Sequence, residues 1–141
     1  MADPGTEPME ATIRGEGGAA VLLLHGQPGT AGDWQRVAGL LEDRYTVVVP
    51  DRPGYGATGG RATGFAGNAR ATADLLDRLG IERTVMVGHS WAGGVALAAA
   101  RDYPDRVAGL VLVSSVGPGE HLGWDDRLLA APVIGETLAA T

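Results

Sequence analysis

The sequence predicts an α/β protein with a doubly wound, mostly parallel sheet and helices on both faces. Short runs of β-branched residues alternate with longer segments of helical periodicity, which is typical of successive βαβ units. The strongest runs are nearly continuous in apolar residues, as expected of parallel strands that helices cover on both faces. The 141 residues, of which 45 % are hydrophobic and 20 % charged, suffice for one ordinary domain.

Four strong strands and one weak strand account for the sheet. The strong strands are expected at residues 21–25, 46–50, 85–89 and 107–113, and the weak one at residues 12–14. No internal repeat or low-complexity tract is evident.

Three helices are expected between the strands. The first begins at Thr30, because Thr30 and Asp33 have the spacing of a capping box. The second spans residues 64–79 and ends at Gly80, a residue that suits the left-handed conformation at a helix end. The third opens at Ser90 and ends before a proline. Four apolar positions of the first helix should face the sheet: Trp34, Val37, Ala38 and Leu41.

Composition and charge exclude several classes of partner. The formal net charge is -6 and no lysine or arginine cluster is present, so nucleic acid is not expected as a partner. The absence of cysteine excludes disulfides and thiolate metal sites, and neither a metal nor a cofactor is expected. The apolar runs are shorter than the ~18 residues of a membrane span. The first residues lack the pattern of a secretory signal, so a cytoplasmic location is expected.

Residues 87–94, VGHSWAGG, place a serine between a predicted strand and a predicted helix. Gly88 and Ala92 stand two residues before and after Ser90, a spacing that resembles the nucleophile elbow G-x-S-x-G of the α/β-hydrolases. The elbow needs small neighbours because its serine sits on a tight, strained turn. There Ser90 would project from a helix N-terminus, which favours developing negative charge. The alternative is that Ser90 merely caps the helix, as serine often does.

Residues 25–34, HGQPGTAGDW, resemble the HG-x-P-G oxyanion loop of the same family. Acyl transfer needs at least two donors aimed at the oxygen that becomes negative. The resemblance implies that these are the backbone N–H groups of Gln27 and Trp91, while His25, followed by Gly26, braces the turn. The alternative is a plain strand-to-helix connection without a functional role.

Residues 51–59, DRPGYGATG, match a turn that is common in this superfamily and are expected to be structural. Gly54 and Gly56 permit backbone angles that other residues avoid, and Asp51 is expected to accept hydrogen bonds from N–H groups of the loop. The resemblance disfavours Asp51 as a catalytic acid, because the family's acids follow later strands.

The order of strands that the resemblance implies supports the same site. The strand at 21–25 would then lie between those at 46–50 and 85–89, and the winding of the sheet would reverse there. Open α/β sheets bind ligands beyond the carboxyl ends of their strands at such a switch point. Ser90 and the loop of Gln27 are expected to flank that crevice.

The general base for Ser90 is missing from the expected place. In family members the serine is followed along the chain by the acid and then by the histidine. The histidines of this chain are His25, His89 and His121, and His121 stands beside Glu120. None of the three is expected to act as the base. The resemblance implies that residues 1–116 form the N-terminal half of a hydrolase core and that 117–141 begin a helical cap domain that is cut off. Residues 107–113 should then form an exposed sheet edge.

The resemblance implies a serine hydrolase that acts through an acyl-enzyme on a small-molecule ester, thioester, amide or activated carbon–carbon bond. Family epoxide hydrolases and haloalkane dehalogenases have aspartate where this chain has Ser90. As this fragment the protein is expected to be inactive, with a complementing C-terminal half as a partner. Three alternatives remain: a non-catalytic ligand-binding module, a cofactor-free haloperoxidase-type enzyme, and one chain of a split enzyme. Tyr55, Trp91 and Trp124 are candidates for lining a pocket.

Overall fold

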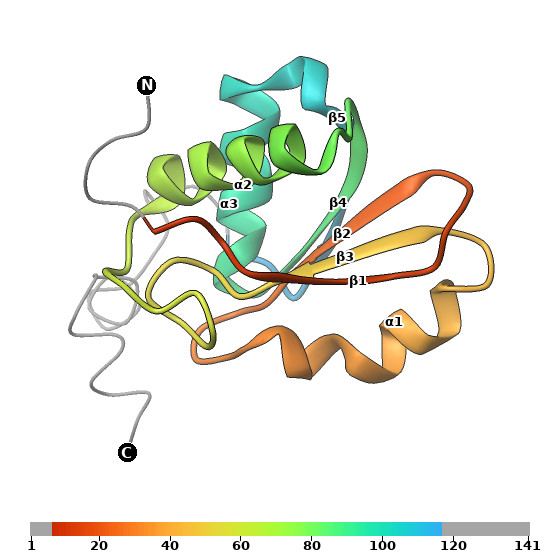
Figure 1. Ribbon diagram of the computed structural model, residues 1–141. Helices are drawn as coiled ribbons and strands as arrows, with labels where there is room; N and C mark the ends of the chain where they lie inside the picture. Colours follow the sequence, from red (N-terminus) through yellow and green to blue (C-terminus); the bar gives the residue numbers. More distant parts are fainter. Residues whose placement is uncertain (1–6, 117–141) are drawn as a thin grey trace.

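The computed structural model describes residues 7–116, which form a five-stranded sheet with helices on both faces (Figure 1). The strand order is β1-β3-β2-β4-β5. The strands are β1 (Ala11–Arg14), β2 (Ala20–Leu24), β3 (Thr46–Pro50), β4 (Thr84–His89) and β5 (Val107–Val113). All neighbours pair in parallel except β1, which lies antiparallel to β3. The prediction of a mostly parallel sheet is confirmed, and the weak fifth strand is its antiparallel edge.

The helices lie in two layers, which confirms the doubly wound architecture. A short 3₁₀ turn, η1 (Ala31–Trp34), leads into α1 (Gln35–Leu41) below the sheet in Figure 1. Above the sheet lie α2 (Phe65–Leu79) and α3 (Trp91–Asp102), and the 3₁₀ turn η2 (Pro104–Arg106) leads into β5. The predicted order, with β2 between β3 and β4, is therefore present, and the winding reverses at β2.

Alternating side chains of the central strands build a separate core on each face. In β2, Leu22 and Leu24 belong to the core with α2 and α3, whereas Val21 and Leu23 belong to the core with α1. Leu22, Leu23 and Leu24 are fully buried at 0 % exposure, because a central parallel strand is covered on both faces. This explains why the sequence of β2 is an unbroken apolar run.

The start of the first helical segment differs in part from the prediction. The capping box is present, since Thr30 Oγ1 accepts from Gly32 N–H at 3.2 Å and Asp33 Oδ2 accepts from Thr30 N–H at 3.2 Å. It begins the 3₁₀ turn η1, however, and α1 begins only at Gln35. The expectation that Val37 faces the sheet is wrong, because this side chain is 39 % exposed. Successive helical residues turn by about 100°, so the buried Ala38 leaves Val37 on the flank.

The other predicted helix boundaries agree with the structure to within one residue. Helix α2 ends before Gly80, which has the left-handed φ of 68°. Helix α3 follows Ser90 and ends at Asp102, two residues before Pro104. None of the helices within residues 7–116 is long and apolar enough to cross a membrane.

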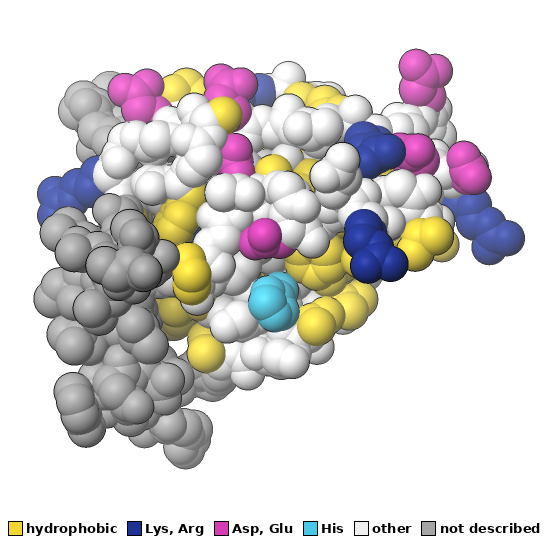
Figure 2. Space-filling model, turned by 90° about the horizontal axis from the view of Figure 1, so that it is seen from below, with side chains coloured by type: hydrophobic (Ala, Val, Ile, Leu, Met, Phe, Trp, Pro, Cys, Tyr) yellow, Lys and Arg dark blue, Asp and Glu magenta, His cyan; other side chains and the backbone are white. Residues whose placement is uncertain are grey.

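Strand β5 forms the expected edge of the sheet. Among residues 7–116 it pairs with β4 alone, and its side chains are open to solvent, with Val111 46 % and Val113 40 % exposed. Further apolar side chains lie in the open on α1, where Leu40 is 83 % exposed. Figure 2 shows the face that includes α1, on which hydrophobic and charged side chains are interspersed.

Candidate active site

Ser90 occupies a sharp corner between β4 and α3. Its backbone angles are φ 52° and ψ -120°, a conformation that residues other than glycine rarely adopt. The corner is fixed on both sides, since Ser90 N–H donates to the Val113 carbonyl at 2.9 Å and the Ser90 carbonyl accepts from Val116 N–H at 3.1 Å. Its side chain makes no capping hydrogen bond to α3. The interpretation of Ser90 as a mere helix cap is therefore wrong.

The glycines around the corner stand where a side chain would collide. A Cβ on Gly88 would lie 2.5 Å from the Ala92 carbonyl oxygen, and one on Gly94 would lie 2.5 Å from the Phe65 ring. A Cβ on Gly93 would overlap Ser115 Oγ. Gly88 thus lets β4 and the first turn of α3 approach each other closely, whereas Gly93 makes room for Ser115 after β5 and Gly94 for the Phe65 ring of α2.

The loop after β2 lies directly against the corner. A Cβ on Gly26 would be 3.1 Å from Ser90 Cβ and 3.1 Å from His89 Nδ1. This proximity follows from the sheet, because β2 and β4 are parallel neighbours whose carboxyl ends meet at one edge, with Leu24 opposite Gly88. The structure thus brings His25, Gly26 and Gly88 together with Ser90, as the sequence predicts.

His25 braces the loop and is not available as a base. Its ring is fully buried, and Nε2 accepts from the Arg52 backbone N–H at 3.0 Å. The proton must therefore reside on Nδ1, which donates to the Gly26 carbonyl at 2.9 Å. Burial, aided by the nearby Arg52 cation, lowers the pKa of His25 from 6.5 to about 4. His25 is thus neutral at pH 7, with both ring nitrogens engaged.

The other histidines do not supply a base within the described part of the chain. His89 is exposed, and its ring meets Trp34 edge-on with centroids 6.4 Å apart. Within residues 7–116, no hydrogen bond joins the Ser90 hydroxyl to either ring. His121, Glu120 and Trp124 lie outside the described residues, as does the predicted cap at 117–141.

Arg52 is a feature of the site that the sequence interpretation missed. Its guanidinium is buried at 1 % exposure, and it lies 4.6 Å from the ring centroids of both Tyr55 and Trp91. It donates from Nε to the His25 carbonyl at 2.8 Å and from Nη2 to the Gly26 carbonyl at 2.9 Å. Burial lowers the pKa of Arg52 to about 10, so it remains a cation at neutral pH.

No local pattern indicates the burial of Arg52, because an arginine in a glycine- and proline-rich loop is usually exposed. A third contact fixes it from helix α2, where Asn68 Oδ1 accepts from Nη1 at 3.3 Å. The Trp91 ring lies against the Arg52 guanidinium, so Trp91 packs within the site. Its indole Nε1–H is buried without a hydrogen-bond partner among the described residues.

Asp51 has the structural role that the sequence predicts. Its Oδ2 accepts from Ala57 N–H in its own loop at 2.9 Å, and its Oδ1 accepts from Ala31 N–H at 2.7 Å. Gly56 has φ 49°, and a Cβ there would overlap the Asp51 carboxylate. The carboxylate thus ties the loop after β3 to the start of η1.

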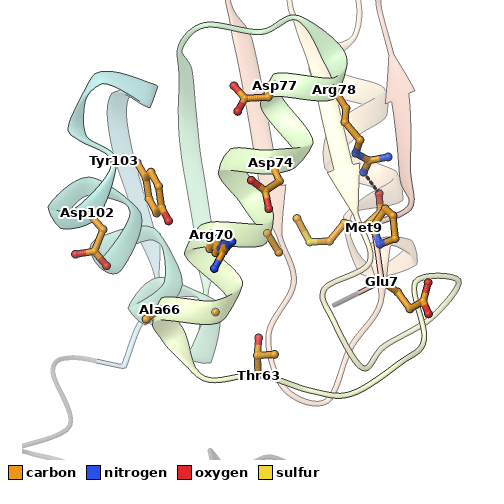
Figure 3. Close-up of a pocket in the computed structure, with 13 residues that line it drawn as sticks. Glu7, Met9, Thr63, Ala66, Arg70, Asp74, Asp77, Arg78, Asp102 and Tyr103 are labelled. Atoms are coloured by element: carbon orange, nitrogen blue, oxygen red, sulfur yellow. Dashed lines mark hydrogen bonds between the residues drawn. The ribbon is translucent and has the colours of Figure 1, made fainter. Parts of the chain in front are cut away.

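A groove of about 830 Å³ lies along α2 (Figure 3). Both signs of charge line it, including Arg70, Arg78 and Asp74, and Arg78 donates to the Met9 carbonyl. None of the elbow or loop residues described above lines this groove. Within residues 7–116 there is also no cluster of acidic residues and histidines that would hold a metal ion.

Comparison with known proteins identifies the family. Residues 19–132 match the family model of the alpha/beta hydrolase fold. The chain therefore belongs to the α/β-hydrolase family, whose enzymes include hydrolases of several classes.

Two curated relatives and one solved structure illustrate the similarity. The chain is 42 % identical to the dihydrolipoyllysine-residue acetyltransferase component of the acetoin cleaving system of Cupriavidus necator, over 84 % of this chain and 33 % of that protein. It is 37 % identical to a 2-hydroxy-6-oxo-6-phenylhexa-2,4-dienoate hydrolase of Comamonas testosteroni, over 72 % of this chain and 37 % of that protein. The structure of a thermophilic esterase from Thermogutta terrifontis superposes with a TM-score of 0.72 and is 34 % identical in sequence. The match covers 77 % of this chain and 40 % of the esterase. The chain spans about a third of the length of these curated relatives.

Proposed function

We propose that this chain contributes the nucleophile and the oxyanion loop of a serine hydrolase. The observation that supports the proposal most strongly is the conformation of Ser90, whose strained backbone holds a hydroxyl that caps no helix, beside the loop of Gly26. Strain of this kind costs about 1–3 kcal/mol and is concentrated at functional sites.

The proposed reaction proceeds through an acyl-enzyme. Ser90 Oγ attacks the carbonyl carbon of the substrate and loses its proton to a base, while the carbonyl π electrons move to the oxygen. The resulting oxyanion accepts hydrogen bonds from the backbone N–H groups of Gln27 and Trp91. Collapse of the intermediate expels the leaving group, which takes up the proton from the base. Water then releases the acid product by the same steps.

The base and the acid that orients it are proposed to lie outside residues 7–116. Both ring nitrogens of His25 are engaged, and His89 packs on Trp34 rather than on the hydroxyl. A complementing C-terminal segment with an acid and a histidine would provide both groups. Such a segment would also cover the exposed edge strand β5. A cytoplasmic location remains a prediction.

The proposed substrate is a small-molecule ester, thioester or amide, with an activated carbon–carbon bond as a further possibility. The names of two relatives support this range, since one is an esterase and the other a dienoate hydrolase. A soluble epoxide hydrolase of Corynebacterium and a fluoroacetate dehalogenase of Burkholderia are relatives too. The serine at position 90 favours acyl transfer over those two reactions, because family enzymes of that kind have aspartate at the elbow.

Turnover of a nitrophenyl ester tests the proposal. We expect little or no hydrolysis by the chain alone and restored hydrolysis when a C-terminal half with the acid and the histidine is added. Ser90→Ala should abolish the restored activity. If the chain alone hydrolyses the ester robustly and Ser90→Ala removes this activity, the proposal that the base lies outside residues 7–116 is contradicted.

The same preparation discriminates the alternative functions. If the complemented protein binds small ligands but neither hydrolyses esters nor reacts with a fluorophosphonate, the chain is a non-catalytic binding module. Peroxide-dependent halogenation without a cofactor would indicate a haloperoxidase-type enzyme instead. Co-purification of a second polypeptide that provides a histidine would indicate a split enzyme.

A further inference from the structure

The Gly26 carbonyl receives two hydrogen bonds from buried side chains. His25 Nδ1–H donates to it at 2.9 Å, and Arg52 Nη2–H donates to it at 2.9 Å. A carbonyl oxygen has two lone pairs, so both of its acceptor positions are used. One of the two donors carries a full positive charge, and charge-assisted hydrogen bonds are about twice as strong as neutral ones.

This carbonyl belongs to the same peptide unit as the N–H of Gln27. The Gly26–Gln27 bond is trans, since the cis peptide bond in this loop is the following one, Gln27–Pro28. A trans peptide is planar, and its C=O and N–H point in opposite directions. Groups that fix the direction of the Gly26 carbonyl therefore fix the direction of the Gln27 N–H.

Arg52 also contacts the first residue of helix α3. Its guanidinium lies 4.6 Å from the centroid of the Trp91 ring, and Trp91 is the first residue of α3, directly after Ser90. One side chain thus contacts both the loop of Gln27 and the residue that follows the nucleophile.

We propose that Arg52 is a positioning residue that orients and polarises the Gly26–Gln27 peptide as an oxyanion donor and keeps it in register with the start of α3. The inference rests on the proposed function, because it assigns Arg52 to the oxyanion site of that reaction. A cation at the carbonyl withdraws electron density from the amide, which makes the N–H at its other end a stronger donor. Within residues 7–116, Arg52 forms no salt bridge with a carboxylate, so its charge acts on two carbonyls, one amide oxygen, the Tyr55 side chain and the Trp91 ring.

The first test uses the unaltered chain and nuclear magnetic resonance. The Nε–H of Arg52, bound to the His25 carbonyl, should exchange with solvent at least about tenfold more slowly than that of the exposed Arg36. Equal exchange rates at the two side chains would overturn the proposal, whatever the catalytic properties of the chain.

The second test compares Arg52→Lys and Arg52→Met with Arg36→Met as a matched control. Lysine keeps the charge but loses the planar fork that reaches two carbonyls. The amide ¹⁵N resonance of Gln27 should shift in both Arg52 variants, more in Arg52→Met, and should not move in Arg36→Met. If it is unchanged in the folded Arg52→Lys variant, Arg52 does not orient this peptide.

The third readout separates positioning from general stability. In the chain, or in the complemented protein where labelling needs it, the maximal rate of phosphonylation by a fluorophosphonate should fall about 10- to 100-fold in Arg52→Lys. The probe concentration for half-maximal rate should stay unchanged, because the donor acts on the transition state. A rise in that concentration at constant maximal rate would contradict the proposal. If the unaltered protein is not labelled at all, the proposed function fails, while the exchange and resonance data still decide the role of Arg52.

Discussion

Gly26 and Ser90, which are 64 positions apart in the sequence, are so close that a Cβ on Gly26 would lie 3.1 Å from the Ser90 Cβ. This contact joins the loop after β2 to the corner after β4 and sets the width of the proposed oxyanion site. A methyl group there would have to push the two segments apart, since the His89 carbonyl oxygen also lies 3.3 Å from that position.

Gly26→Ala should therefore reduce the reactivity of the site more than the stability of the fold. We expect fluorophosphonate labelling of the complemented protein to slow by about tenfold or more, with a loss of about 1–2 kcal/mol in the free energy of unfolding. Gly17→Ala is the matched control, because a Cβ on Gly17 has no neighbour within 4 Å. Equal labelling rates in Gly26→Ala and Gly17→Ala would show that the contact does not matter for the site.

The strained backbone of Ser90 makes a prediction about stability. Glycine adopts φ 52° without the steric cost that serine meets, so Ser90→Gly should raise the free energy of unfolding by about 1 kcal/mol. Ser90→Ala keeps the strain and loses no described hydrogen bond of the side chain, so its stability should change by less than about 0.5 kcal/mol. Denaturant titration measures both. A fall of stability in Ser90→Gly would mean that the corner is not strained.

Burial of neutral His25 predicts a loss of stability in acid. The folded state has the lower pKa, about 4 against 6.5, so the unfolded state binds more protons between these values. The stabilisation is complete above pH 6.5 and is lost as the pH falls toward 4, and the difference corresponds to roughly 3 kcal/mol. A protonated ring would also turn its Nε2 into a donor facing the Arg52 N–H.

His25→Asn provides the comparison, because it removes this titration and leaves His89 and His121 in place. The free energy of unfolding should fall more steeply between pH 7 and pH 4.5 in the unaltered chain than in the variant. The same pH dependence in both would contradict the assignment of a neutral, buried ring.

Asp51 should matter for stability and not as a catalytic acid. Asp51→Asn leaves one of two N–H donors, those of Ala31 and Ala57, without its acceptor, which costs about 1–3 kcal/mol. Asp43→Asn, at an exposed position, should cost almost nothing. Labelling of Ser90 should survive in both variants at a rate within about tenfold of the unaltered protein. Complete loss of labelling in a folded Asp51→Asn variant would indicate a chemical role instead.

The sequence predicts the Ser90 corner well because its requirements are local. Gly88 and Ala92 flank the serine in the chain, and a Cβ on Gly88 would lie 2.5 Å from the Ala92 carbonyl oxygen, so the tight turn itself requires the glycine. Gly93 and Gly94 are required instead by Ser115 and Phe65, which the sequence does not place beside them. The strand order could likewise be predicted from the family resemblance, and β2 lies between β3 and β4 as expected. The donors proposed at Gln27 and Trp91 stay predictions.

Features that depend on several distant segments could not be predicted in the same way. The burial of Arg52 results from carbonyls after β2, an amide of α2 and a ring of α3, which meet only in the fold. The exposure of Val37 follows from the orientation of α1, which turns Ala38 to the core and leaves Val37 on the flank, and the periodicity of the apolar residues does not reveal which of the two is buried. The antiparallel direction of β1 is a property of the pairing and not of its four residues.

Peptide mapping of the complemented protein after reaction with a fluorophosphonate decides whether Ser90 is the nucleophile. We expect one phosphonylated residue, Ser90, and no modification in the Ser90→Ala variant. Modification of another residue, or an unmodified Ser90 in a folded and complemented protein, would contradict the claim that this corner holds the nucleophile.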